Sequence, residues 1–180
     1  EFIDGIKALS MQNPPMGNRI LIVTNGGGFG VIVADHCSEN GLEVPPPSPQ
    51  LKEKLGSKFS AFYVVNNPVD LTGSACDSDY YIALNACMIE SDEYDAAIII
   101  PLMAPQGMTE KVVDLITETM KRSGKPAVIC TVGGAFTMKI KGLFEEREFP
   151  VYPSPERSAR AMSMLLKRRV LQEGAVRSAI

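Results

Sequence analysis

Short apolar runs alternate along this chain with longer segments of helical periodicity, and this alternation limits the possible folds more than any single motif does. The clearest runs span 19–24, 96–100, 126–132 and 151–152. Continuous apolar runs of about four to eight residues are typical of strands buried on both faces of a parallel sheet. Strands that alternate with helices are joined by right-handed crossovers. The sequence therefore predicts an α/β domain with helices on both faces of a mainly parallel sheet.

The number and order of these segments indicate a flavodoxin-like three-layer sandwich with strand order 2-1-3-4-5. The segment 61–65 is either a short edge strand or an irregular stretch, and 66–73 reads as a polar loop. Helices are predicted over 2–10, 29–40, about 49–55, 78–90, from 109, 136–148 and from 154, with Ser48, Ser78, Thr109 and Ser154 as candidate N-caps. Their predicted core residues include Tyr81, Leu84, Ala86 and Met88, then Val112, Val113, Ile116 and Met120, and finally Ala159, Met162, Leu165, Leu166 and Val170. We expect an N-terminal helix and linker at 1–18, the flavodoxin-like domain at 19–173 and a tail at 174–180.

Composition excludes several classes of function. The chain has 180 residues, 45% of them hydrophobic, and a formal net charge of -3, so nothing favours a nucleic-acid partner. Its apolar runs are too short to span a bilayer, and we expect no membrane contact. The four cysteines lack metal-ligand spacing and there is one histidine, so no metal site is predicted. Scattered cysteines of this kind are typical of reduced thiols in a cytoplasmic protein.

A glycine-rich turn follows the first apolar run and opens the next helix. It comprises Asn25, Gly26, Gly27, Gly28, Phe29 and Gly30. The first N–H groups of a helix have no partner within it, and the helix dipole favours negative charge there. Glycines let the backbone approach a phosphate closely. These residues are therefore the candidate phosphate-binding site, the alternative being a tight turn that binds nothing. The spacing matches neither a dinucleotide-binding fingerprint nor a Walker loop.

Three loops should meet beyond the carboxyl ends of the strands, where ligands bind in open α/β sheets. These loops span 25–30, 101–107 and 133–135. Gly133 and Gly134 are therefore secondary phosphate-site candidates. Asp70 and Thr72 are candidates for orienting a phosphate or its metal. The alternative for this pair is structural, with Asp70 capping a turn and Thr72 bonding nearby backbone.

Several motifs occur in one order over nearly the whole chain. They are the segments 14–19 (PPMGNR), 22–31 (IVTNGGGFGV), 39–44 (ENGLEV), 67–73 (NPVDLTG) and 151–157 (VYPSPER). With these motifs the chain resembles the C-terminal, succinyl-CoA synthetase-like ligase domain of the α subunit of ADP-forming acyl-CoA (acetyl-CoA) synthetases.

The resemblance implies an enzyme that converts acyl-CoA, ADP and phosphate to acid, CoA and ATP through an acyl phosphate and a phosphohistidine. It also implies CoA-binding, phosphohistidine and ATP-grasp domains or subunits as partners. ADP or ATP, CoA and Mg are implied for the full enzyme, and none is expected to be bound by this segment alone. The family's His-Thr-Gly motif is absent here, and the one histidine, His36, lies two turns into a helix. We therefore place no catalytic nucleophile on this chain and expect a phosphate-holding and subunit-docking module.

Two other functions remain open at this point. The same set of domains resembles the non-catalytic part of certain protein acetyltransferases, where the domain would sense ligands or act as a scaffold. A flavodoxin-type FMN carrier is the third alternative. It is disfavoured because the phosphate loop is not rich in Ser or Thr and no aromatic pair is placed to flank a flavin.

Overall fold

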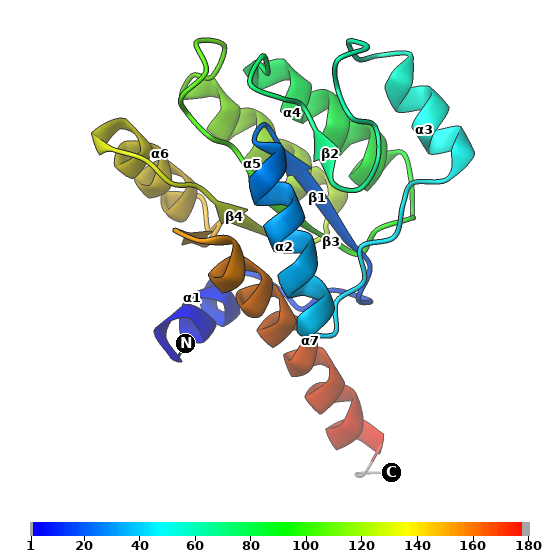
Figure 1. The fold of residues 1–180 in the computed structure, drawn as a ribbon. Coiled ribbons are helices and arrows are strands. Elements are labelled where there is room, and N and C mark those ends of the chain that lie inside the picture. Colours follow the sequence, from blue (N-terminus) through cyan, green and yellow to red (C-terminus); the bar gives the residue numbers. More distant parts are fainter. Residues whose placement is uncertain (1, 178–180) are drawn as a thin grey trace.

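A computed structural model describes residues 2–177 of the chain, and Figure 1 shows their arrangement. Five parallel strands form one sheet of order β2-β1-β3-β4-β5, as predicted. The strands are β1 (Ile20–Thr24), β2 (Val69–Asp70), β3 (Ala96–Ile100), β4 (Ala127–Cys130) and β5 (Val151–Tyr152). Residues 178–180 of the tail predicted at 174–180 lie outside the described residues.

Helices cover both faces of this sheet. On one face are α1 (Phe2–Met11), α2 (Gly27–Glu39) and α7 (Pro155–Arg177). The other face carries α3 (Pro49–Gly56), α4 (Asp77–Leu84), a π-helical turn η1 (Asn85–Ile89), α5 (Lys111–Ser123) and α6 (Ala135–Glu146). In Figure 1 the last part of α7 extends beyond the body of the domain.

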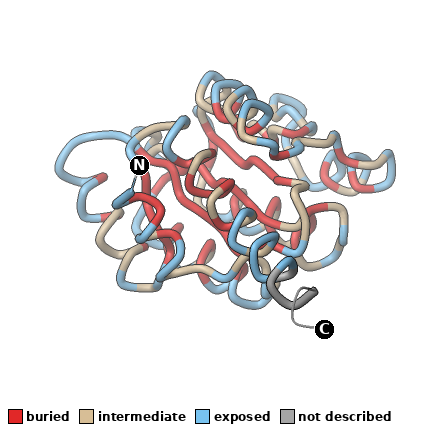
Figure 2. The backbone as a smooth tube through the Cα atoms, turned by 90° about the horizontal axis from the view of Figure 1, so that it is seen from below, coloured by how far each residue is buried: buried red, intermediate tan, exposed pale blue. Residues whose placement is uncertain are grey.

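The core consists of two apolar layers, one on each side of the sheet, and Figure 2 shows buried residues concentrated between the exposed outer helices. Successive side chains of a strand point to opposite faces, so Leu21 and Val23 join the layer under α3–α6 while Ile20 and Ile22 join the layer under α2 and α7. All residues of β1, β3 and β4 are buried, which explains why these runs are apolar throughout.

The second strand lies where a polar loop was predicted. Residues 61–65 are irregular apart from one bridge, between Val64 and Asp70. Val69–Asp70 instead pairs with β1. Just before it, the buried Asn67 side chain accepts a hydrogen bond from the Ile22 N–H (2.9 Å) and donates one to the Ile20 carbonyl (2.8 Å). This amide therefore continues the strand pairing along β1 where backbone pairing stops.

The fourth helix also differs from its prediction. It begins after Cys76, not Ser78, and the Asp79 carboxylate accepts a hydrogen bond from the Cys76 N–H. Tyr80 is fully buried and donates from its hydroxyl to the Ile100 carbonyl. Tyr81 was predicted to lie in the core, but it is exposed. The predicted single helix to 90 is divided by the π-helical turn.

Most other core predictions are confirmed, but Leu166 is only partly buried and Val170 is not in the core. The four predicted residues of α5 are buried, and so are Ala159, Met162 and Leu165 of α7. Val170 is exposed, because that part of α7 extends past the sheet. Three cysteine thiols are buried, those of Cys37 and Cys130 in the α2 layer and that of Cys87 in the α4–α5 layer.

Candidate functional site

The order of strands reverses between β1 and β3, and the side chain of Asn25 joins the loops that follow these two strands. Its amide donates to the Leu102 carbonyl (2.8 Å) and its oxygen accepts from the Leu102 N–H (2.9 Å). This paired contact imitates a strand pairing beyond the sheet edge. Beside it, the Thr131 hydroxyl after β4 donates to the Pro101 carbonyl. Two of the three predicted loops, 25–30 and 101–107, are thereby held together, and the strand that precedes the third is anchored to them.

The glycine-rich turn opens α2 at this switch point. The Gly26 N–H donates to the Thr24 hydroxyl (3.0 Å), and the N–H groups of Phe29 and Gly30 both donate to the Gly26 carbonyl. Within the described residues, the N–H groups of Gly27 and Gly28 make no hydrogen bond, and α2 has no side-chain N-cap. Of the six predicted phosphate-site residues, these two therefore present free donors, while the others shape the turn.

Close packing explains three of these glycines. A Cβ atom added at Gly26 would lie 2.5 Å from a Leu102 methyl group, and one at Gly27 would lie 2.4 Å from a carboxylate oxygen of Asp70. One at Gly30 would lie 2.9 Å from a Thr24 methyl group. A Cβ at Gly28 would meet nothing within 4 Å. A side chain at Gly28 would therefore enter open space beside the free N–H groups.

Asp70, at the end of β2, is brought against the glycine turn, but Thr72 is not. The Asp70 carboxylate accepts from the Thr72 N–H (2.8 Å), which is the turn-capping contact expected as one alternative. Its second oxygen faces Gly27. Thr72 has a left-handed backbone, and its hydroxyl pairs with that of Ser74 (2.9 Å). Asp70 therefore combines a structural role with a position beside the candidate anion site.

Gly133 and Gly134 lie at a separate helix N-terminus, that of α6, on the opposite face of the sheet from α2. Gly133 has a φ of 155°, and a Cβ there would lie 2.3 Å from the Thr137 hydroxyl oxygen. A glycine is needed at this position for both reasons. The two pairs of glycines thus belong to two different helix termini along one edge.

His36 lies on α2, within hydrogen-bond distance of Glu39 (2.8 Å between Nδ1 and Oε2). It lies in the last turn of the helix rather than at its N-terminus, and Glu39 is exposed. The contact is a surface pair near the C-terminal end of the helix, where the helix dipole favours positive charge.

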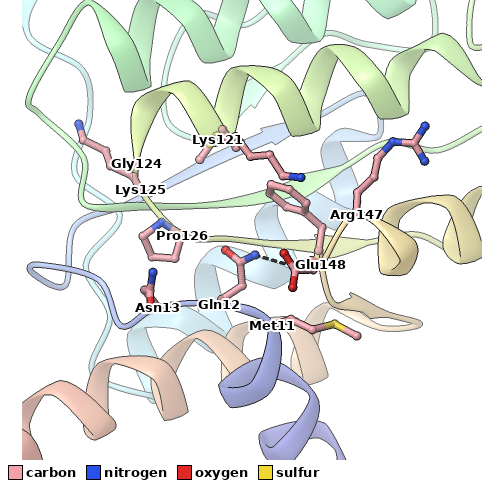
Figure 3. Close-up of a pocket in the computed structure, with 11 residues that line it drawn as sticks. Met11, Gln12, Asn13, Lys121, Gly124, Lys125, Pro126, Arg147 and Glu148 are labelled. Carbon is pink, nitrogen blue, oxygen red and sulfur yellow. Dashed lines mark hydrogen bonds between the residues drawn. The ribbon is translucent and has the colours of Figure 1, made fainter.

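A cavity of about 220 Å³ lies at the opposite, amino edge of the sheet (Figure 3). Gln12 lies in it, donating to the Glu148 carbonyl (2.6 Å) and accepting from the Ala127 N–H (2.9 Å). Gln12 therefore ties the chain after α1 to the start of β4 and to the segment that leads into β5. Two of the three cations that line it are engaged elsewhere, Lys125 with Ser91 and Arg147 with Asp114. The cavity is structural in character.

Two searches cover the described residues 2–177. Among them no group of three or more His, Cys, Asp or Glu side chains is placed to hold a metal ion. No helix in this part of the chain combines the length and apolar character needed to cross a membrane.

Known proteins match both the sequence and this geometry. The Ligase-CoA domain family model matches residues 20–161. The α subunits of acetate–CoA ligase (ADP-forming) I and II of Pyrococcus furiosus are each 32% identical to the chain, over 93% and 87% of its length. The solved structure of an acetyl-coenzyme A synthetase 1 from Ca. Korarchaeum cryptofilum, in complex with phosphate and ADP, superposes with a TM-score of 0.86 at 29% identity. That match covers 98% of this chain.

The chain spans only about a third of these relatives: 36% and 35% of the two α subunits and 38% of the solved chain. The match nevertheless covers the whole sheet, from β1 into α7, and includes both helix N-termini at its carboxyl edge. The chain belongs to the Ligase-CoA domain family.

Proposed function

We propose that this chain works as part of an ADP-forming acyl-CoA synthetase and that the N-terminus of α2 holds the phosphoryl group during its transfer. The relatives named above are ligases of this class, and about two thirds of each lies outside the region that this chain matches. The remaining domains would supply CoA binding, nucleotide binding and the phosphohistidine. In this proposal the domain carries no nucleophile of its own.

The observation that carries the proposal is the pair of free N–H groups at Gly27 and Gly28, which lies at the switch in strand order. A helix N-terminus attracts an anion through these donors and through its dipole. Phosphoryl transfer depends mainly on positioning and on stabilising charge on the phosphoryl oxygens. A rigid turn with two fixed donors is suited to that task, and Asn25 and Thr24 supply the rigidity.

Asp70 would act next to the phosphoryl group. A second anion beside the same helix terminus would repel a bare phosphate, so the carboxylate oxygen that faces Gly27 fits best as one ligand of a phosphate-bound Mg²⁺. Mg²⁺ in such sites is commonly held by one or two carboxylates together with phosphate oxygens and water. The chain's own contribution would be to place the carboxylate, through its contact with the Thr72 N–H.

Gly28→Val in the whole synthetase tests the proposal. Its side chain would enter open space over the free donors without striking the fold. Losing hydrogen bonds to a charged group costs about 2–3 kcal/mol, so we expect histidine phosphorylation to slow on the order of a hundredfold. CoA binding should be unchanged. Gly142→Val is the matched control, since Gly142 also lies in a helix, α6, with nothing within 4 Å of an added Cβ.

A folded Gly28→Val enzyme that is phosphorylated at the wild-type rate would show that the turn holds no phosphate. If the whole protein forms no phosphohistidine at all, the scaffold or ligand-sensing function becomes the better explanation.

A further inference from the structure

A second cavity, of about 270 Å³, opens beyond the carboxyl ends of β4 and β5. It lies between the first turns of α6 and the segment that leads from β5 into α7. Its lining includes Gly133, Thr137 and Lys141 on one side and Val151, Tyr152 and Pro153 on the other. The volume is several times the roughly 30 Å³ that one water molecule occupies in the liquid, so the cavity has room for a small ligand.

The Thr137 hydroxyl lines this cavity without a hydrogen-bond partner. Thr137 is only 8% exposed, and none of the described residues bonds its side chain. Every side-chain nitrogen or oxygen that is fully enclosed within residues 2–177 does have a partner. The Thr137 hydroxyl is therefore not fully enclosed, and the space that Thr137 lines is this cavity. A nearly buried hydroxyl without a protein partner indicates a missing ligand or water.

Further donors surround the same space. Within the described chain, the N–H groups of Ala135, Phe136 and Thr137 make no hydrogen bond, because they form the uncapped first turn of α6. Lys141 follows Thr137 by one helical turn and also lines the cavity. It forms no ion pair with any residue that the structure describes. No carboxylate lines this cavity, whereas Asp70 lies against the α2 turn.

We propose that the N-terminus of α6 is a second anion site, in which the Thr137 hydroxyl and the Lys141 ammonium bind a small oxyanion. The ligand chemistry is a phosphate or carboxylate group, because the free polar groups are donors and one of them is charged. The helix dipole adds to the same preference. This site is independent of the proposal for α2, since it uses another helix on the opposite face of the sheet.

Amide ¹⁵N–¹H spectra of the 180-residue chain can observe both helix termini at once. Inorganic phosphate is titrated in one series and acetate in another, at constant ionic strength and pH. We expect a saturable shift of the Ala135, Phe136 and Thr137 amides in at least one series. The series that binds more tightly identifies the source of the oxyanion. Flat curves for these three amides in both series would overturn the proposal.

Thr137→Val and Lys141→Gln test the two side chains. Thr137→Val keeps the shape of the side chain and removes its hydroxyl, and Lys141→Gln removes the charge. Each should weaken anion binding at the α6 amides about tenfold or more, with the spectrum otherwise dispersed as in the wild type. Thr119→Val and Lys139→Gln are the matched controls. The Thr119 hydroxyl bonds within its own helix, and Lys139 pairs with Glu110 outside the cavity.

Wild-type affinity in both Thr137→Val and Lys141→Gln would refute the assigned site even if the amides shift. The Gly27 and Gly28 amides report on α2 in the same spectra. Gly28→Val should abolish anion-dependent shifts at those amides and leave the α6 curves unchanged. Failure at one terminus is therefore distinguishable from failure at the other.

Discussion

The N-termini of α2 and α6 are both glycine turns at one sheet edge, yet they are constructed differently. Around α2, side chains from two other segments lie against the glycines: Leu102 after β3, and Pro68 and Asp70 of the β2 segment. Around α6, an added Cβ at Gly133 would meet only Thr137 of the same helix, and one at Gly134 would meet nothing within 4 Å. The first turn is held by the sheet and its loops, while the second is a local structure beside an open cavity.

The two turns therefore differ in what they offer an anion: the α2 turn offers fixed donors, and the α6 turn offers positive charge. The α2 turn has donors in fixed positions with a carboxylate next to them, which suits an anion that arrives with a cation. The α6 turn has a lysine and an unpartnered hydroxyl, which suits an anion that arrives alone. A glycine motif by itself therefore does not identify the stronger anion site, because the neighbours of the turn decide its charge.

The largest expected effect comes from removing the Asn67 side chain, which is bonded to β1, the strand that leads into the α2 turn. Asn67→Ala leaves the Ile22 N–H and the Ile20 carbonyl without partners, and both residues are fully buried. We expect a loss of about 3 kcal/mol in the free energy of unfolding, measured by urea denaturation. Asn66→Ala, at an exposed neighbouring position, is the control. A loss below about 0.5 kcal/mol, the range of ordinary surface substitutions, would mean that the Asn67 amide does not support β1.

A smaller effect separates the two turns directly. In Gly30→Ala the new Cβ would lie 2.9 Å from a Thr24 methyl group and 3.1 Å from Pro68, so overpacking should cost about 1–3 kcal/mol. Gly134→Ala meets open space, so only the poorer N-cap should count, at about 0.5 kcal/mol. Thermal unfolding of the two variants side by side provides the measurement. Equal melting temperatures would remove the contrast between a packed turn and an open one.

The smallest expected effect is the loss of stability at acid pH that comes from the Asp4–Arg157 ion pair, which lies beside β5. A hydrogen bond from Arg157 holds the pKa of the Asp4 carboxyl below its usual value, although burial opposes this. A lowered pKa in the folded state stabilises the protein above about pH 4, and this contribution is lost as pH falls through the folded-state pKa. The bond ties α1 to the start of α7, and Tyr152 of β5 also donates to the Asp4 carbonyl.

The melting temperatures of the wild type and Asp4→Asn should therefore differ at neutral pH and converge in acid. Glu118→Gln, an exposed carboxylate on α5, should show no such convergence. A gap between the wild type and Asp4→Asn that stays constant down to about pH 3 would exclude the Asp4 carboxylate as its source.

The sheet could be predicted from the sequence because three strands are buried on both faces and so have continuous apolar runs. β2 could not, since it has two residues and relies on the Asn67 side chain for the adjoining pairing with β1. In the Val151–Arg157 motif, Arg157 binds Asp4, a partner 153 residues away. No local pattern predicts a contact of that kind.

The candidate site was predicted as a glycine segment but not in its details. Chain spacing indicates a helix N-terminus, while the contact of Asp70 with Gly27 depends on how β2 pairs with β1. Thr137 and Lys141 were missed, although their spacing of four residues places both on one face of α6. That spacing is common in helices, and the cavity that makes it informative is created by the approach of β5 and the chain after it.

Each side of the sheet contains a buried cysteine whose reactivity reports on local opening of that side. Burial raises the pKa of Cys37 and Cys87 to about 12 and that of Cys130 to about 11. Because thiolates are the reactive species, alkylating reagents should modify these positions only when the surrounding layer opens. The modification rate of Cys37 would then report how often the α2 side opens, and that of Cys87 how often the α4–α5 side opens. Mass spectrometry of a single sample would thus compare the frequencies of local opening on the two sides of the sheet.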